Sequence, residues 1–171
     1  MNTHNQFPAT RSTVEQINHN ATTWIGHRRY DNSNMVTGQT FMAPSGGDLD
    51  TIEVYSSVVT RPGKVTLTLH SFDPQQNKWG PGLGTATVDF DHNSNGKWIP
   101  FKLQGLQLTK GLSYGFKLEC TETYIGVGEA AGSYQHPPFI TGQEWRFINN
   151  NQTPDAYSYF SLAFKVGLKA A

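Results

Sequence analysis

The sequence predicts an all-β fold in which two antiparallel sheets pack face to face as a sandwich. Two observations support this expectation. Apolar residues alternate with polar ones in many short runs, as at Val65, Leu67 and Leu69, which is the period of a strand with one buried face. Turn sequences such as RPG at 61–63 and NG at 95–96 separate these runs. Roughly ten short strands at this spacing are typical of a β-sandwich.

The alternation can be followed along most of the chain. Apolar residues recur at every second position, so one face of each segment can enter a core while the other meets solvent. We find no internal repeat and no linker, and a length of 171 residues suits a single domain. The clearest segments are residues 52–54, 65–69, 83–91, 97–104, 114–118 and 162–166.

The N-terminal segment has a different pattern. Ser12 and Glu15 have the spacing of a capping box, in which a hydroxyl and a carboxylate satisfy the free backbone amides at the start of a helix. This spacing predicts one short helix over residues 13–21. We therefore expect residues 1–35 to form an arm and short helix, packed on the domain or extending from it. Residues 36–171 are expected to form the sandwich.

The composition excludes some classes of partner. Thirteen basic and thirteen acidic residues give a net charge of zero, whereas a nucleic-acid groove needs a basic excess. We therefore expect no nucleic-acid binding. No apolar run approaches the roughly 20 residues of a membrane helix, so we also expect no membrane insertion. The many Asn, Thr, Ser, Gln and Gly residues favour an extracellular, cell-surface or particle-associated location. The first residues nevertheless lack the apolar segment of a secretory signal.

The sequence contains no recognisable catalytic motif. It has no G-x-S-x-G run, and its six histidines lack the spacing that places two imidazoles on one metal. Its carboxylates stand in polar turns or on solvated strand faces. The glycine-rich residues 126–132 are similar to a dinucleotide loop, but Pro137 and Pro138 follow where that loop would need a helix. We expect no catalytic residue.

Calcium is the one cofactor that the sequence suggests. Asp91, Asn93 and Asn95 stand two residues apart and Gly96 follows them, as at the start of a calcium loop. The bidentate carboxylate twelve residues from the first ligand is missing, because Lys102 occupies that position. Asn95-Gly96 also favours a hairpin between strands 83–91 and 97–104. We therefore prefer a turn to a metal site.

The connection that contains residues 132–147 is the best candidate for a binding site, because a long loop in a compact sandwich is more often functional than decorative. Flat aromatic rings can stack on the C–H faces of sugars, while amides and carboxylates pair with their hydroxyls. For Trp145, a place in the core and a role as a binding platform are both open. The candidate ligand-binding residues are Glu129, Tyr134, His136, Phe139, Gln143, Trp145 and Arg146.

Several segments between residues 36 and 168 resemble a family of bacterial jelly-roll modules from secreted and surface proteins, including choice-of-anchor-like and carbohydrate-binding-module-like domains. The family often has Asp where this chain has Ser161. The resemblance implies a jelly-roll sandwich used for binding or for building surface structures rather than for catalysis. The segments that carry it are GQTF (38–41), LDTIEVY (49–55), GKVTLTLHSFD (63–73), GPGLGTATV (80–88), WIPFKLQGLQLTKGLSYGFKLEC (98–120) and SLAFK (161–165).

These observations predict a non-catalytic recognition module that binds carbohydrate or a surface glycan, as in adhesion, through loops at one end of the sandwich. The first alternative is a structural or decoration subunit of a phage, an injection-type or a surface assembly, in which residues 1–35 would dock on a neighbouring subunit. The second alternative is a sandwich-type enzyme acting on glycosides. The expected partners are therefore a carbohydrate or other subunits of an assembly.

Overall fold

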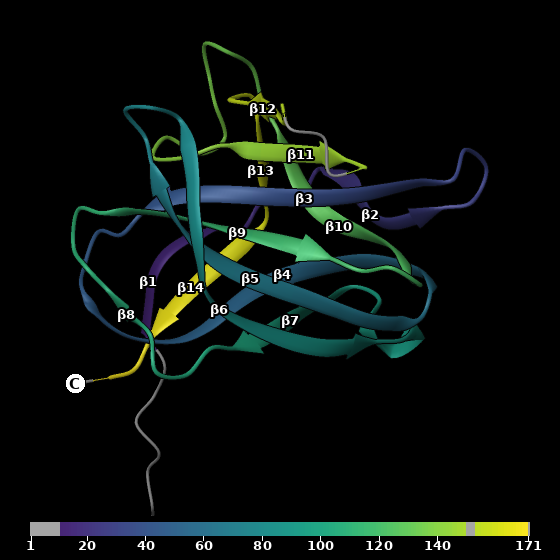
Figure 1. The fold of residues 1–171 in the computed structure, drawn as a ribbon, viewed down its shortest axis with the longest axis horizontal. Helices are drawn as coiled ribbons and strands as arrows, with labels where there is room; N and C mark the ends of the chain where they lie inside the picture. Colours follow the sequence, from purple (N-terminus) through teal and green to yellow (C-terminus); the bar gives the residue numbers. More distant parts are fainter. Residues whose placement is uncertain (1–10, 150–152, 171) are drawn as a thin grey trace, which may run out of the picture.

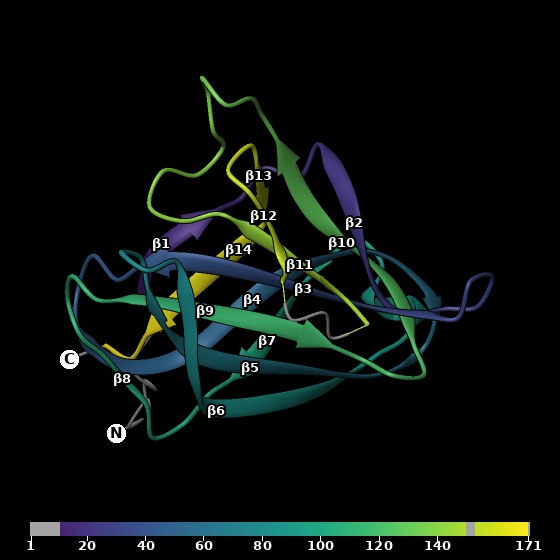
Figure 2. The same ribbon diagram turned by 45° about the horizontal axis from the view of Figure 1, so that its top comes forward.

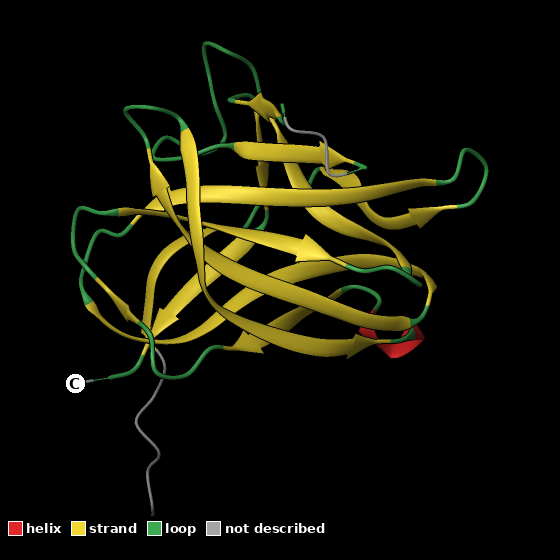
Figure 3. Ribbon diagram, viewed as in Figure 1, coloured by secondary structure: helices red, strands yellow, loops and turns green. Residues whose placement is uncertain are grey.

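The computed structural model describes residues 11–149 and 153–170, which form an antiparallel all-β molecule with one short helical turn (Figure 3). This confirms the all-β, antiparallel part of the expectation. The strands are β1 Arg11–Gln16, β2 Ala21–Arg28, β3 Ser33–Met42, β4 Gly47–Arg61, β5 Gly63–Asp73, β6 Lys78–Phe90, β7 Lys97–Lys102, β8 Gln107–Leu108, β9 Ser113–Glu119, β10 Tyr124–Ala131, β11 Glu144–Ile148, β12 Asp155–Tyr157, β13 Phe160–Leu162 and β14 Phe164–Leu168, and the helical turn η1 is His92–Ser94.

The strands form two groups of hydrogen-bonded neighbours (Figure 1). One group runs in the order β6, β5, β9, β3, β11 and β12. In the other, β4 pairs with β7 and β8 on one side and with β14 on the other, and β14 pairs with β1. Strands β2 and β10 connect the groups, because β10 pairs with both β4 and β2, and β2 pairs with β3. The jelly-roll connectivity stays a prediction.

The apolar faces of the two groups pack against each other. The ring of Phe164 on β14 lies 6.0 Å from that of Phe41 on β3 and 5.7 Å from that of Phe116 on β9. Phe90 on β6 likewise lies 6.0 Å from Phe101 on β7. These rings are almost completely buried. The apolar residues of the alternating runs therefore form a core between the two groups of strands.

The predicted helix over residues 13–21 is wrong. Ser12 does donate a hydrogen bond to the carboxylate of Glu15, at 3.1 Å, but these residues belong to β1, which pairs with β14. A helix cap contributes about 1 kcal/mol, whereas pairing satisfies the backbone along an open sheet edge and buries Gln16. Residues 11–35 supply β1, β2 and the first residues of β3, and β2 lies inside the strand order. Residues 1–10 lie outside the described residues.

The predicted hairpin at Asn95-Gly96 is also wrong, although the stretch is a turn. Strand β6 pairs with β5 and strand β7 with β4, so residues 91–96 cross between the two groups. Asn95 has φ −57° and ψ 129°, and Gly96 has φ 69°, which are the angles of a type II turn rather than of a hairpin turn.

No helix among residues 11–149 and 153–170 has the length and apolar character needed to cross a membrane.

Candidate functional site

A pocket of about 300 Å³ opens between the β10–β11 connection, residues 132–143 (the long loop), and the β5–β6 hairpin. Figure 1 shows these two segments rising on the same side of the molecule, and Figure 2 keeps them adjacent. We call this the loop–hairpin pocket. It is lined by Thr40, Phe72, Pro74, Asn77, Ser113, Pro137, Phe139, Ile140, Thr141, Gly142, Gln143 and Ser158.

The long loop is fixed to β3 beside the pocket. The backbone N–H of Thr40 donates to the carbonyl of Gln143 at 3.0 Å, and the N–H of Gln143 donates to the Thr40 hydroxyl, also at 3.0 Å. Gly142 permits this close approach, because a side chain there would overlap the backbone carbonyl of Thr40. Phe139 anchors the middle of the loop with its ring 5.2 Å from that of Phe164. The pocket wall is therefore held by both the sheet and the core.

The opposite wall is the tip of the β5–β6 hairpin. The carboxylate of Asp73 accepts hydrogen bonds from the backbone N–H groups of Gln75 and Gln76, at 2.9 and 3.2 Å. Asn77 then adopts a positive φ of 54°, which asparagine tolerates better than most residues. These local interactions define a tight turn that presents the exposed amide of Asn77 to the pocket.

The lining chemistry of the pocket is neutral. Its polar side chains are hydroxyls and amides, and its remaining side chains are aromatic, aliphatic or proline. None of the residues that line it is charged. Ile140 is 89% exposed, so the rim presents apolar surface to solvent. Such a mixture of apolar walls and a few polar groups is typical of small-molecule sites, whose volumes are about 300–1,000 Å³.

The structure brings Phe139 and Gln143, two of the predicted site residues, into this pocket. Trp145 does not line the pocket but contacts one of its lining residues, Phe72. Trp145 is only 4% exposed, and its ring contacts Phe72 at 5.8 Å and Trp79 at 5.9 Å, both edge to face. Trp145 therefore supports the aromatic wall from the interior.

Glu129 and Arg146 lie elsewhere, in a buried ion cluster with Glu144. The Arg146 guanidinium donates to Glu129 at 2.9 Å and to Glu144 at 3.2 Å, while Glu129 and Glu144 are 3% and 0% exposed. Burial and the neighbouring Glu129 raise the pKa of Glu144 to about 10, so Glu144 carries a proton at neutral pH. The guanidinium also lies over the rings of Tyr157 and Phe160, at 4.7 and 4.9 Å.

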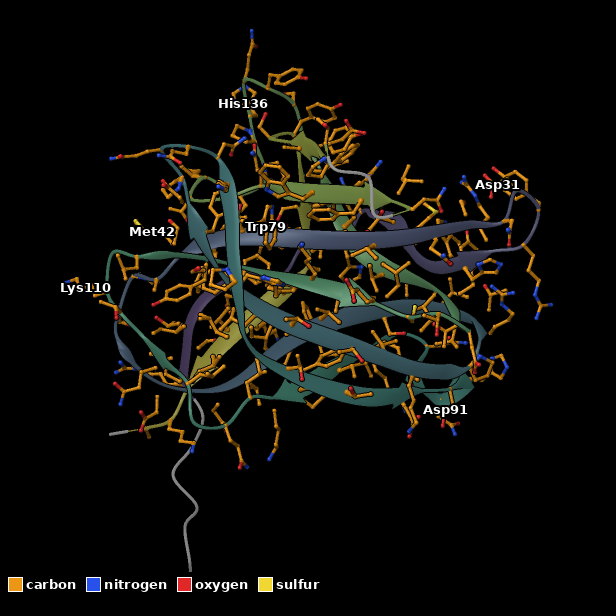
Figure 4. The ribbon with its side chains drawn as sticks, viewed as in Figure 1. Asp31, Met42, Trp79, Asp91, Lys110 and His136 are labelled. Carbon is orange, nitrogen blue, oxygen red and sulfur yellow. The ribbon has the colours of Figure 1, made fainter. Side chains whose placement is uncertain are left out.

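Tyr134 and His136 point outward from the other part of the long loop. Tyr134 is 78% exposed and meets the ring of Tyr159 edge to face at 4.7 Å. Figure 4 shows His136 at the tip of the loop, away from the sheets. His136 lines a separate open hollow together with residues 17–20 and 130–132. The seven predicted residues therefore do not form one site.

The residues proposed as calcium ligands take part in backbone hydrogen bonds instead. The Asp91 carboxylate caps η1 by accepting from the N–H of Asn93 at 2.8 Å, and the amide oxygen of Asn95 accepts from the N–H of Val59 at 2.7 Å. Within the described ranges, no group of three or more His, Cys, Asp or Glu side chains is placed to hold a metal ion.

Sequence reasoning missed the half of the pocket that the β5–β6 hairpin supplies, notably Phe72 and Asn77. The sequence DPQQN at 73–77 signals a turn, and Trp79 follows it. That signal was sufficient to place a hairpin here. It could not show that the hairpin faces the long loop, because the two segments are about sixty residues apart in the sequence.

No family model matches the chain, and no curated protein matches it. One solved structure that is similar to it is that of the cysteine protease and lectin-like domains of Cwp84, a surface layer associated protein of Clostridium difficile. The two share 16% sequence identity with a TM-score of 0.50, over 80% of this chain. This chain corresponds to about a third of that chain's length, since the match covers 32% of it. At this identity, the comparison shows a shared fold.

Proposed function

We propose that this protein is a non-catalytic recognition module that binds an uncharged carbohydrate in the loop–hairpin pocket. The observation that carries the proposal is the lining of that pocket. It combines apolar surface from Phe72, Phe139 and Ile140 with hydroxyl and amide groups, and it includes no charged side chain.

This lining suits the chemistry of a sugar ring. The C–H faces of a sugar are apolar and can lie against aromatic or aliphatic side chains, while its hydroxyls exchange hydrogen bonds with amides and hydroxyls such as those of Asn77 and Gln143. A charged ligand would lose hydration free energy on entering a pocket that offers it no opposite charge, so a neutral ligand is favoured. The net charge of zero on the whole chain is compatible with the same class of ligand.

The structural comparison agrees with this proposal without carrying it. The similar chain from Clostridium difficile includes a domain described as lectin-like and belongs to a surface layer associated protein. We propose by analogy that this module also works at a cell surface or outside the cell, where glycans are accessible.

The proposal assigns no catalytic role to the buried carboxyl pair. A glycosidase places two carboxyl groups across the bond that it cleaves, about 5–10 Å apart and open to substrate. Glu129 and Glu144 are instead bonded to the same guanidinium and are almost completely buried. Their arrangement supports a structural role for this pair.

A glycan array with matched variants tests the function. In one variant, Asn77→Gly and Gln143→Ala remove two amide groups from the pocket; glycine keeps the positive φ at position 77. We expect binding of uncharged glycans to weaken about tenfold or more, because each lost hydrogen bond contributes about 0.5–1.5 kcal/mol.

Asn32→Gly is the matched control, because Asn32 is an exposed turn residue with φ 56° on the β2–β3 turn. Figure 4 places its neighbour Asp31 at the far side of the molecule. This variant should bind as the wild type does. If the wild type binds no glycan and forms a defined oligomer in size-exclusion chromatography, the structural-subunit alternative replaces the proposed function.

A further inference from the structure

A second hollow adjoins the loop–hairpin pocket at Phe72, which lines both. We call it the Trp79 hollow, and it measures about 500 Å³. It is formed by the strand ends of the β5–β6 hairpin next to the tip that carries Asn77. Its lining residues are Ser71, Phe72, Asp73, Lys78, Trp79, Gly80 and Pro81.

The indole of Trp79 is held rigidly in this hollow. The outer edge of its six-membered ring (Cζ2, Cη2 and Cζ3) rests against Gly38 of β3 and Gly115 of β9, where a side chain on either glycine would collide with it. The ring also meets Phe72 and Phe147 edge to face, each at 5.6 Å. Trp79 stays partly exposed despite these contacts. The ammonium of Lys117 also lies over the ring, 5.0 Å from its centroid. A partly exposed ring that is held by such contacts needs little ordering when a ligand packs against it.

The polar groups beside Trp79 differ from those of the first pocket. Asp73 and Lys78 are paired across the hairpin, and both side chains are exposed. The carboxylate accepts hydrogen bonds and the ammonium donates them, so together they can hold adjacent hydroxyls of one sugar unit. The loop–hairpin pocket offers only uncharged partners. The two hollows therefore provide complementary contacts on either side of Phe72.

We propose that the ligand is an oligosaccharide chain, with one sugar unit in the loop–hairpin pocket and a neighbouring unit stacked on Trp79 between Asp73 and Lys78. This inference rests on the proposed function, since it extends the same site along the ligand. It makes Trp79 a determinant of chain length: a single sugar gains nothing from it, whereas a longer chain does.

Nuclear magnetic resonance of the uniformly ¹⁵N-labelled wild-type protein tests this directly. The probes are glucose and N-acetylglucosamine, their β-1,4-linked disaccharides and tetrasaccharides, and every uncharged glycan bound in the array together with its terminal monosaccharide. Monosaccharides should shift the side-chain amide signals of Asn77 and Gln143. The longer probes should additionally shift the indole N–H signal of Trp79. The indoles of Trp24 and Trp98, which line neither hollow, serve as internal references.

The outcomes separate the two proposals. If probes of every length shift the pocket amides and none shifts the Trp79 indole, the oligosaccharide inference is wrong while carbohydrate binding stands. If no probe and no array glycan shifts either set of signals, both proposals fail.

A pair of variants gives the energetic counterpart. Trp79→Phe keeps an aromatic ring on the hairpin but reduces its surface, and Lys78→Ala removes the ammonium. Each should weaken tetrasaccharide binding about fivefold, the effect of truncating one good contact, and leave monosaccharide binding unchanged. Lys102→Ala, at an exposed lysine on β7, is the control. Equal weakening for both chain lengths would overturn the inference.

Discussion

Two buried carboxyl groups, Glu129 and Glu144, share the single guanidinium of Arg146. One positive charge cannot compensate two negative ones in a buried site, so the pair retains a proton, and burial together with Glu129 raises the pKa of Glu144 to about 10. The folded state therefore binds this proton more tightly than the unfolded state, in which the ordinary pKa is 4.5. The resulting stabilisation is complete below pH 4.5 and is lost as the pH rises towards 10.

Glu144→Gln should remove this pH dependence, because glutamine resembles the protonated acid at every pH. In urea unfolding followed by tryptophan fluorescence, we expect the wild-type free energy of unfolding to fall as the pH rises from 4.5 towards 10. The slope for one proton is at most about 1.4 kcal/mol per pH unit. The Glu144→Gln profile should be flatter, while Glu122→Gln, at an exposed glutamate, should follow the wild type. Identical slopes for wild type and Glu144→Gln would contradict this account.

The sequence predicts that Glu129 and Arg146 bind a ligand. In the structure both belong to an ion cluster whose third member, Glu144, is not among the predicted residues. Glu144 and Arg146 are two apart on β11 and so share a face, which the sequence does show. What it cannot show is that Glu129 of β10 approaches that face. This contact depends on how distant strands pack in three dimensions.

At the level of elements, the alternation of apolar and polar residues predicts the strands correctly. The capping-box spacing predicts a helix where the structure has a strand. The alternating runs at 65–69 and 114–118 lie within β5 and β9, because their period of two matches a sheet with one buried face. The Ser12–Glu15 spacing predicts a helix start, but this segment pairs with the edge of β14 instead. A capping box does form at Asp91 and Ser94, where the sequence predicts a hairpin. Local sequence signals do not show which distant strand is available for pairing.

The long loop shows how one element depends on a single small residue. Gly142→Ala places a methyl group against the carbonyl of Thr40, so the loop must move away from β3. We expect a loss of about 1–3 kcal/mol in the free energy of unfolding, as for other overpacked sites, together with weaker glycan binding. Chemical denaturation and the glycan array measure the two effects.

Gly82→Ala is the matched glycine substitution. The nearest atom to its added methyl group is the methyl carbon of Thr68, at 3.3 Å, which has to move by only a few tenths of an ångström. Both stability and binding should therefore change much less than in Gly142→Ala. If Gly142→Ala were equally silent, the close contact between the long loop and β3 would not be what shapes the pocket.

At the scale of the whole molecule, Phe164 contacts both the core and the long loop that forms one wall of the pocket. It is fully buried between the two layers, against Phe41 and Phe116, and it also supports Phe139 of the long loop. The sequence placed Phe164 on the buried face of its strand from alternation alone. Its role under the pocket depends on the long loop folding back onto the core, and no periodic pattern in the sequence predicts that arrangement.

Phe164→Ala should therefore lower both stability and binding. Removing a fully buried phenylalanine costs about 3–5 kcal/mol, and the loss of support for Phe139 should weaken glycan binding in the fraction that remains folded. Thermal and urea unfolding measure the first effect. Leu112→Ala, at a residue that is 55% exposed, is the control and should stay within about 0.5 kcal/mol of the wild type. A small effect at Phe164 would mean that the layers are not packed as described.

The pairing of β1 with β14 has a practical consequence for attachment. Arg11 lies opposite Leu168, so the two ends of the described chain are neighbours, and Figure 1 shows them at the opposite side of the molecule from the long loop. A bead, a fluorescent protein or a further domain joined at either end will therefore leave the loop–hairpin pocket facing outward. A short peptide could also close the ends into a ring, which would allow the chain to be reopened in a distant surface turn without cutting through the site.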